Sequence, residues 1–383
     1  MHMGNPAADV PRIDGGVVVG IEPYDLPESM TFAHSTRMAD SWQALPECIV
    51  QRAMRVGRAS LHVSIFTGST ADLGANRAPT QNPIKQIKRA QTVDRHGDYL
   101  FDTRYEVDSN VGHYIVDTIP KILVAKDFIS KREGREVELY AILKEGSSPM
   151  SFEIFRAFGI PTLATEAKVR GQIVKTVETA AKTSLDGRML HADAPMMAGC
   201  LPGLYADFRA SLVPEGTTTP DKIYISRRDS RTVENETEIV RLLEARGFRK
   251  YLFETGELSL IEQWRLVAGA SQIVAIHGAG LTPLIFNRRG LARAPGDLGG
   301  LRIIEIHGAG YFVDFNRRLA ALANAHWCGV RGRITPEVVR DLDERGGGRI
   351  QQSASFRIDP EALALALEHS DRCGQTQVSG IRQ

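Results

Sequence analysis

The fold of this chain is most tightly constrained by an alternation of short apolar runs and helical patterns between residues 222 and 306. Strands are predicted over residues 222–226, 248–253, 273–276 and 301–306. Helices are predicted over residues 235–246, which end before Gly247, and from a capping box at residues 259–262 to residue 268. Because strands that alternate with helices form parallel sheets, the sequence predicts an α/β fold.

One strand end in this region has the features of an anion site. The apolar run Ile273–Ile276 is followed by His277, Gly278, Ala279, Gly280, Leu281 and Thr282, which turn the chain and begin a predicted helix with Pro283 in its first turn. The N–H groups of a first helical turn are unpaired, and small residues let a phosphate approach the backbone. A tight turn whose histidine bonds nearby backbone is the alternative, and the spacing alone leaves both open.

Three arginines follow the strand at residues 222–226. The sequence continues Ser226-Arg227-Arg228-Asp229-Ser230-Arg231. Guanidinium groups fit phosphate bidentately, so arginines at the carboxyl end of a parallel strand are placed to bind a diphosphate. The alternative is a solvated loop whose arginines pair with Asp229 or Glu234.

A histidine and an aspartate four residues apart form a second candidate site. His113 and Asp117 share one face of a predicted helix, beside an apolar stripe of Ile115, Ile119 and Ile122. A histidine held by a carboxylate suits a general base, whereas an isolated pair of this kind is also typical of a helix surface. Pro120 predicts a kink or short break in the helix.

The rest of the chain gives weaker signals. Further strands are predicted at residues 17–19, 61–66, 137–143 and 173–177, helices at 151–158, 202–212 and 360–368, and a linker at 213–220. Residues 67–98 are expected to be a surface loop whose basic run 85–89 is solvated. The motif at 277–280 recurs at 307–310, which we interpret as chance similarity between successive strand–helix periods.

Composition excludes several classes of protein. The 383 residues carry a net charge of +1, so no global field favours nucleic acid or membrane. No apolar run approaches the ~20 residues of a spanning helix, and residues 1–6 lack the apolar core of a signal peptide. The four cysteines form no Cys-x-x-Cys pair. We expect a cytoplasmic protein, with room for peripheral membrane association through a partner.

Three sequence blocks together resemble glycosyltransferase family 61. They are Asn110-x-x-His113-x-x-x-Asp117-x-x-Pro120, then Tyr224-Ile225-Ser226-Arg227-Arg228 with Arg231, Asn235 and Glu236, and finally His277-Gly278-Ala279-Gly280-Leu281-Thr282. Glu262, Gln263 and Glu305 are also similar to the family. The resemblance covers residues 105 to 310. The third block departs from the family at Pro283, where asparagine is common.

This resemblance implies a GT-B architecture, with two Rossmann-like domains whose parallel sheets face a cleft. The expected domains are residues 1–215 on the acceptor side, residues 216–355 for the nucleotide sugar, and residues 356–383 as a helix that returns to the amino-terminal domain. The family implies inverting transfer from a nucleotide sugar, usually a UDP-sugar, to a saccharide hydroxyl in surface polysaccharide biosynthesis. No metal or other cofactor is expected, and Asp341-Leu342-Asp343 is interpreted as exposed surface.

Roles for single residues follow from this hypothesis. His113 or Asp117 would serve as the base, and the sequence does not decide between them. The diphosphate would be bound by Ser226, Arg227, Arg228, Arg231, His277 and the turn from Gly278 to Thr282, and Glu305 would hold the ribose hydroxyls. Two alternatives remain at this level: an epimerase or phosphorylase-like enzyme of GT-B type, and an idle nucleotide-binding or scaffold subunit of a polysaccharide assembly complex, which Pro283 favours.

Overall fold

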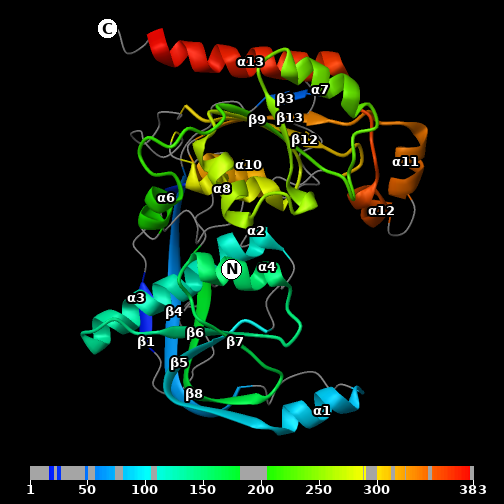
Figure 1. Ribbon diagram of the computed structural model, residues 1–383. Helices are drawn as coiled ribbons and strands as arrows, with labels where there is room; N and C mark the ends of the chain where they lie inside the picture. The colour runs from blue at the N-terminus through cyan, green and yellow to red at the C-terminus, as the bar shows by residue number, and fades with distance from the viewer. Residues whose placement is uncertain are drawn as a thin grey trace, which may run out of the picture. The chain divides into compact units, whose positions relative to one another are not determined.

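The computed structural model describes the strands 17–20, 24–26, 48–50 and 57–73 and residues 81–104, 110–181, 205–287, 289, 300–311, 315–323, 325–343 and 347–379. These residues pack as two compact units. The first unit contains strands β1, β2 and β4 to β8 with helices α1 to α4, and the second contains β3 and every element after Tyr205 (Figure 1).

The first unit is built on a seven-stranded mixed sheet of order β1-β4-β8-β5-β6-β7, with β2 paired to β4. The strands are β1 (Val17–Gly20), β2 (Tyr24–Leu26), β4 (Gly57–Leu73), β5 (Thr92–Asp102), β6 (Leu139–Leu143), β7 (Thr162–Ala164) and β8 (Lys168–Ala181). The strands β8, β5, β6 and β7 are parallel neighbours, whereas β4 runs antiparallel to β1 and β8. The expected parallel sheet therefore holds for only part of this unit.

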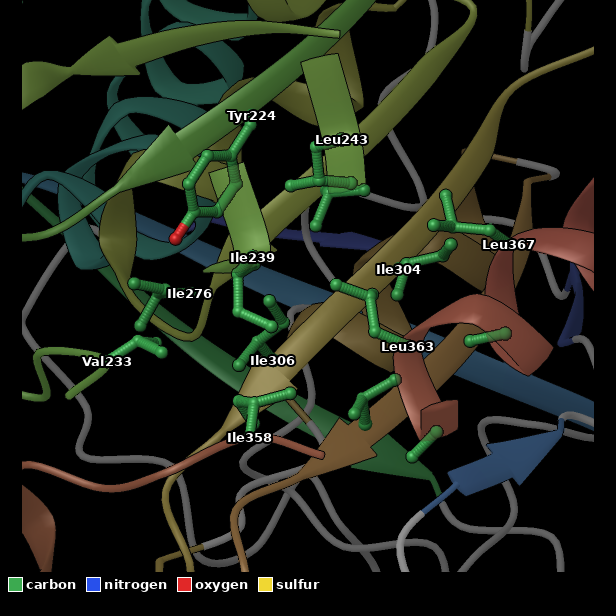
Figure 2. Close-up of a cluster of buried hydrophobic side chains, with 14 of the residues drawn as sticks. Tyr224, Val233, Ile239, Leu243, Ile276, Ile304, Ile306, Ile358, Leu363 and Leu367 are labelled. Atoms are coloured by element: carbon green, nitrogen blue, oxygen red, sulfur yellow. The ribbon is translucent and has the colours of Figure 1, made fainter. Parts of the chain in front are cut away.

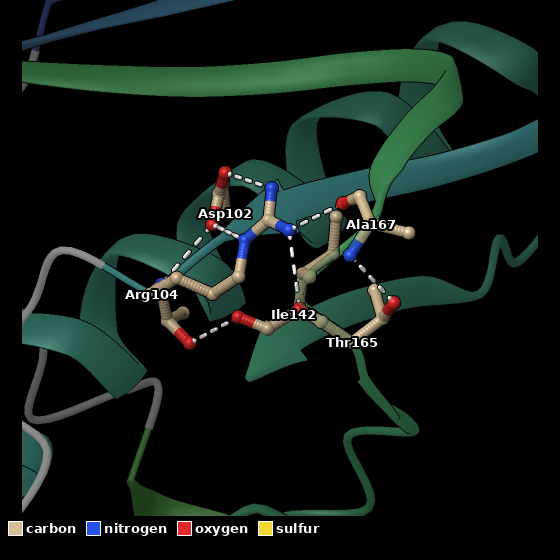
Figure 3. Close-up of polar contacts among 6 residues, drawn as sticks. Asp102, Arg104, Ile142, Thr165 and Ala167 are labelled. Atoms are coloured by element: carbon tan, nitrogen blue, oxygen red, sulfur yellow. Dashed lines mark hydrogen bonds and ion pairs between the residues drawn. The ribbon is translucent and has the colours of Figure 1, made fainter. Parts of the chain in front are cut away.

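A buried arginine fixes the carboxyl end of β5. Arg104, which is 2% exposed, donates from Nε and Nη2 to the two carboxylate oxygens of Asp102 at 2.8 and 2.7 Å. Its Nη1 donates to the carbonyls of Thr165 and Ala167 (Figure 3). The bidentate ion pair with Asp102 holds the guanidinium group in one orientation, and the hydrogen bonds from Nη1 tie the end of β5 to the segment before β8.

The helices of the first unit depart from the sequence-based expectation in one place. They are α1 (Pro83–Ala90), α2 (Val111–His113), the π-helix η3 (Tyr114–Thr118), α3 (Ile119–Glu133) and α4 (Pro149–Ala157). The segment 67–98, expected as a loop, contains α1 and parts of β4 and β5. Helix α1 forms because the Asn82 side chain accepts hydrogen bonds from the N–H groups of Ile84 and Lys85, and Pro83 suits its first turn.

The second unit has a six-stranded sheet of order β10-β9-β11-β12-β13-β3. Its strands are β9 (Lys222–Ser226), β10 (Arg249–Leu252), β11 (Gln272–Ile276), β12 (Arg302–His307), β13 (His326–Arg331) and β3 (Cys48–Val50). All neighbours are parallel except β13 and β3. The parallel α/β sheet predicted from the alternating pattern is confirmed here.

The helices that accompany this sheet are α6 (Ala206–Leu212), α7 (Glu236–Glu244), the 3₁₀ helix η4 (Phe253–Thr255), α8 (Leu260–Gly269), the 3₁₀ helix η5 (Ala279–Phe286), α10 (Phe315–Leu322), α11 (Pro336–Asp343), α12 (Gly347–Ser353) and α13 (Pro360–Ser379). Helix α8 starts at the predicted capping box of Ser259 and Glu262. Among the described residues, no helix is long and apolar enough to cross a bilayer.

The last helix belongs to the core of the second unit. Leu363 and Leu367 of α13 are fully buried in one cluster with Ile304 and Ile306 of β12 (Figure 2). The sequence predicts that this helix returns to the amino-terminal domain. Within the second unit this helix packs against β12, β13, β3 and α7, and its return to the amino-terminal domain stays a prediction.

Helix α6 also packs within the second unit. Phe208 on this helix makes edge-to-face contacts with Trp264 of α8 and Phe286 of η5, with ring centroids 5.8 and 5.0 Å apart. Tyr205 contacts the same Phe286 ring at 5.2 Å. The segment 213–220, interpreted from the sequence as the linker between domains, therefore follows an element that already belongs to this unit.

Candidate active site

The carboxyl ends of three adjacent strands bring the candidate residues of the second unit together. Ala275 of β11 pairs with Ile225 of β9 on one side and with Glu305 of β12 on the other. The strands are therefore in register, and the residues that follow them emerge at one edge of the sheet. Ligands of open α/β sheets bind at this edge.

A buried carboxylate at this edge holds a histidine. The Glu305 side chain is fully buried, and its Oε1 lies 2.6 Å from His277 Nδ1. Asn316 Nδ2 donates to the same oxygen at 2.7 Å, and Trp327 Nε1 donates to Oε2 at 2.9 Å. Because an ionised carboxylate only accepts, His277 Nδ1 must be the donor, which leaves Nε2 for other partners.

His307 completes this buried cluster. Its ring stacks on His277 with centroids 5.1 Å apart, and its Nε2 lies 3.5 Å from Glu305 Oε2. Burial by itself raises the pKa of the Glu305 carboxyl, but the nearby His307 and the hydrogen bond from His277 outweigh burial and hold this pKa well below its ordinary value. Burial lowers the pKa of His307. The arrangement thus favours the ionised form of Glu305, while burial disfavours the charged form of His307.

The structure buries Glu305 completely, and its expected role of holding the ribose hydroxyls stays a prediction. A carboxylate that binds ribose hydroxyls presents an oxygen at the surface of the site. Both oxygens of Glu305 accept hydrogen bonds from buried N–H groups. Glu305 orients His277 from behind. The sequence did not reveal the hydrogen-bond donors to Glu305 that come from α10 and β13.

Two of the three arginines converge on the same histidine. Arg227 and Arg231 donate from Nη1 to the carbonyl oxygen of His277 at 3.3 and 3.0 Å. Arg227 also pairs with Glu254 at 2.9 Å, while the Arg231 guanidinium lies 5.7 Å from the Tyr311 ring centroid. Burial, followed by the charge of Arg227, lowers the pKa of Arg231. This pair of cations therefore creates a partly buried positive potential.

The backbone at Arg231 adopts an uncommon conformation. Its φ of 57° makes it a left-handed residue that is not glycine, and its N–H donates to the carbonyl of Ser353 at 3.1 Å. Such a conformation costs about 1–3 kcal/mol and is found most often at functional sites. The turn directs the Arg231 side chain back to His277, although three residues separate it from Arg227.

Two residues of the arginine segment lie elsewhere. The Arg228 side chain is exposed, and its backbone N–H donates to Glu254 Oε2 at 2.8 Å. Ser226 is buried, and its hydroxyl donates to Glu236. The structure thus brings Arg227 and Arg231 to His277, but it gives Ser226 a packing role.

The turn after His277 is tight but is not the start of an α-helix. Gly278 has an extended backbone, and a Cβ there would lie 2.2 Å from Arg227 Nη1. Ala279 and Gly280 are half-buried in η5, whereas Leu281, Thr282 and Pro283 are buried. The small residues therefore line the edge of the site, and the side chains from Leu281 onward belong to the core.

The other candidate pair lies in the first unit. His113 Nδ1 and Asp117 Oδ2 are 2.8 Å apart, and the two side chains are 45% and 39% exposed. His113 immediately precedes the π-helix η3 and Asp117 lies within it, and the N–H of Ile119 donates to the carbonyl of Tyr114. Pro120 is the second residue of α3, which follows η3 directly, so the helix continues through the proline where a kink or short break was predicted. Short π-helices recur at functional sites.

Residues 111–293 match the model of one protein family, described as Glycosyltransferase 61. The chain carries a glycosyltransferase 61 domain. This domain identifies the protein as a glycosyltransferase, and it confirms the resemblance seen in the sequence. The matched segment begins just before His113 and includes Arg227, Arg231 and His277. A comparison with curated proteins finds no match.

The glycosyltransferase 61 match ends before several residues that complete the site. Glu305 and His307 of β12, Tyr311, Asn316 of α10 and Trp327 of β13 all lie beyond residue 293. Sequence reasoning found Glu305 but missed the others, and it missed Glu254. The second His-Gly-Ala-Gly, at residues 307–310, was the available signal, because its place at an adjacent strand end puts His307 beside His277.

One cluster of side chains in the described part of this glycosyltransferase has the residue types of a metal site. Ligand atoms of His277, Glu305 and His307 lie within 4.8 Å of one another, and all three residues are buried. However, both carboxylate oxygens of Glu305 already accept hydrogen bonds, from Asn316 Nδ2 and Trp327 Nε1. Asp341, of the Asp-Leu-Asp sequence, accepts a hydrogen bond from Gln351 at 2.7 Å. The metal-free reaction remains a prediction.

Proposed function

We propose that this glycosyltransferase is an inverting, metal-independent enzyme that moves a sugar from a UDP-sugar to a hydroxyl group of a saccharide acceptor. The acceptor class we propose is a surface polysaccharide under assembly in the cytoplasm. We further propose a GT-B arrangement in which the second unit binds the nucleotide and the first unit receives the acceptor.

The observation that carries the donor proposal is the pair of guanidinium groups at the His277 carbonyl. Arg227 has Glu254 as its ion-pair partner, whereas the contacts of Arg231 are a carbonyl and an aromatic ring. Two cations held this close repel each other, and burial adds to the cost of charging Arg231. A diphosphate at this edge would offset both effects, because it presents two anionic groups to two planar donors.

The same groups would stabilise the departing nucleotide. Negative charge grows on the diphosphate as the bond from its oxygen to the anomeric carbon breaks, so Arg227 and Arg231 would bind the transition state more tightly than the donor. His277 Nε2 would add a hydrogen bond, with Glu305 holding the ring. One such preorganised donor contributes roughly 3–4 kcal/mol to barrier lowering.

The acceptor side is assigned to His113 and Asp117. In an inverting reaction the acceptor oxygen attacks the anomeric carbon from the face opposite the diphosphate, and its proton passes to a base. The hydrogen bond between His113 and Asp117 fits a base that is oriented and stabilised by its partner. Either residue can take the proton, and general base catalysis of this kind contributes about 10²–10⁴-fold.

Titration of UDP into arginine variants tests the donor site. Arg227→Ala and Arg231→Gly should each weaken UDP binding by about tenfold or more, since each removes a charged donor to phosphate. Glycine is chosen at Arg231 because it tolerates the left-handed backbone. Arg340→Ala is the matched control, because its side chain is 72% exposed on α11. Undiminished UDP affinity in both site variants would refute the proposed donor site.

The reaction itself is tested by supplying UDP-sugars with a saccharide acceptor. We expect product with inverted anomeric configuration, and undiminished activity after chelation of divalent metal. Conversion of a UDP-sugar without acceptor would indicate an epimerase instead. Loss of activity in chelator, restored by a divalent ion, would show that the metal-independent part of the proposal is wrong.

A further inference from the structure

We propose that helix α1 of the first unit is a docking element for the surface of an anionic membrane. This helix, Pro83–Ala90, shows two large apolar side chains to solvent, and Ile84 and Ile87 are 65% and 64% exposed. The residues are three apart and so are neighbours on one side of the helix. Exposed isoleucines at this spacing form an apolar stripe that nothing in the described structure covers.

The charges of α1 are all of one sign. Lys85, Lys88 and Arg89 are its charged residues, and no acidic residue occurs between Pro83 and Ala90. Helical geometry places Lys85 on the side opposite Ile87, with Lys88 between Lys85 and Ile84 around the helix. A helix with a basic face and an apolar face lies in the plane of a bilayer interface, with its apolar side chains in the acyl boundary and its cations among anionic headgroups.

Helix α1 is already folded in the free protein. Asn82 caps its first turn, and the Gln91 N–H donates to the carbonyl of Lys88 at its end. Lys88 pairs with Glu145, which follows β6, so the helix is also held against the body of the unit. Binding therefore does not have to order the helix, and this reduces the entropy cost of docking.

Helix α11 shows why the inferred partner is an anionic bilayer rather than any apolar surface. Both helices have eight residues and begin with proline, and α11 also exposes an apolar pair at the same spacing, Val339 (48%) and Leu342 (47%). Its charges, however, are Glu337, Arg340, Asp341 and Asp343. An anionic surface attracts α1 and repels α11, because each lysine or arginine near the headgroups strengthens binding.

Co-sedimentation of the full chain with vesicles tests the proposal. The chain should bind vesicles of phosphatidylcholine with phosphatidylglycerol, and should bind pure phosphatidylcholine at least about tenfold more weakly. Ile84→Ser/Ile87→Ser should lower the partition coefficient on the anionic vesicles by about tenfold or more, and Lys85→Gln/Arg89→Gln should do the same. Added salt should weaken binding of the unchanged chain.

The matched control is Val339→Ser/Leu342→Ser, which removes a similar exposed pair and should leave vesicle binding unchanged. Equal loss in this control, or equal binding to neutral vesicles, would overturn the proposal. A smaller molar mass in solution for Ile84→Ser/Ile87→Ser, without a change in vesicle binding, would show that a second copy of the chain covers the stripe. Transfer to a soluble acceptor should be unaffected, so this test and that of the proposed function fail separately.

Discussion

At the scale of single residues, Gly278 controls where the guanidinium group of Arg227 can lie. A Cβ at this position would lie 2.2 Å from Arg227 Nη1, while the extended backbone of Gly278 is open to any residue. Gly278→Ala should therefore displace the arginine rather than strain the fold. We expect UDP affinity to fall about tenfold, with a change of less than about 1 kcal/mol in the free energy of unfolding.

The control for this prediction is the equivalent glycine of the next strand end. At Gly308 a Cβ would find its nearest neighbour, Phe356, at 3.7 Å, which is an ordinary contact. Gly308→Ala should leave UDP affinity unchanged. Calorimetric titration with UDP and thermal denaturation of the ligand-free variants measure both quantities, and a similar loss of affinity in the two variants would contradict the argument.

Buried histidines give the protein a pH-dependent stability. Burial lowers the pKa of His307, and it is also the main cause of the lowered pKa values of His326 and His369. The folded state therefore binds fewer protons than the unfolded state below the ordinary histidine pKa of 6.5, and protonation favours unfolding. The neutral forms of these three histidines therefore contribute fully to the free energy of unfolding above this pH, and the contribution is lost as the pH falls.

Chemical denaturation between about pH 7 and pH 5 measures this effect. The free energy of unfolding should decrease across this window, and the decrease should be smaller in His307→Asn, which cannot take up the proton. Glu305 adds a further loss only below its ordinary pKa of 4.5, since its pKa is also lowered in the folded state. An unchanged slope in His307→Asn would show that His307 does not titrate in this way.

Some members of the site could be predicted from the sequence because strand ends have a recognisable pattern. His277, Arg227 and Arg231 follow apolar runs, and parallel strands place such residues at one edge. Leu281 and Thr282 belong to the same motif but are buried, and only the packing of η5 reveals this. The partners of Glu305 come from elements that share no pattern with β12, so no local signal identified them.

At the scale of elements, helix α13 is held in the second unit by the apolar side chains on one of its faces. Leu363 is fully buried against the β12 cluster, whereas Leu365, two residues later on the same helix, is 47% exposed. Leu363→Ala should lower the free energy of unfolding by about 2–5 kcal/mol, because it leaves a cavity in the core. Leu365→Ala is the matched control and should change it by less than about 0.5 kcal/mol. Chemical denaturation compares the two variants, and equal effects would show that α13 is not anchored in this way.

The elements that the sequence predicted were those with a regular apolar period. Strands β9, β11 and β12 and helices α7 and α8 have such a period, and the structure confirms them. Strand β3 was missed because it is short and pairs with β13, which is distant in the sequence. Helix α1 was missed because its stabilising features are one asparagine cap and a proline, and its apolar residues face solvent.

At the scale of the whole molecule, the sequence indicated an α/β protein and the structure supports this in both units. The mixed sheet of the first unit was not foreseen, because the strand predicted at residues 61–66, which is part of β4, gives no sign in the sequence of its antiparallel pairing. The domain limits near residue 215 and the GT-B arrangement remain proposals. These proposals assign nucleotide binding to one unit and acceptor binding to the other. That assignment can be tested by measuring the binding and transfer activity of variants in each unit.

Two histidine variants make that test. His113→Ala should lower the rate of transfer steeply, by about 10²–10⁴-fold, and leave UDP affinity almost intact, because a base acts chiefly in the transition state. His277→Ala should lower both, since the diphosphate is bound before and during transfer. His277 also holds Glu305, so ligand-free stability must be measured for each variant to separate misfolding from lost binding.

The measurements are UDP titrations and a transfer assay on the same preparations. A His113→Ala variant that fails to bind UDP, paired with a His277→Ala variant that binds it normally, would reverse the roles assigned here while leaving the protein a glycosyltransferase. If both variants lose UDP binding to the same extent and keep their stability, the two histidines serve one substrate. The nucleotide and acceptor functions would then not divide between the two units as we propose.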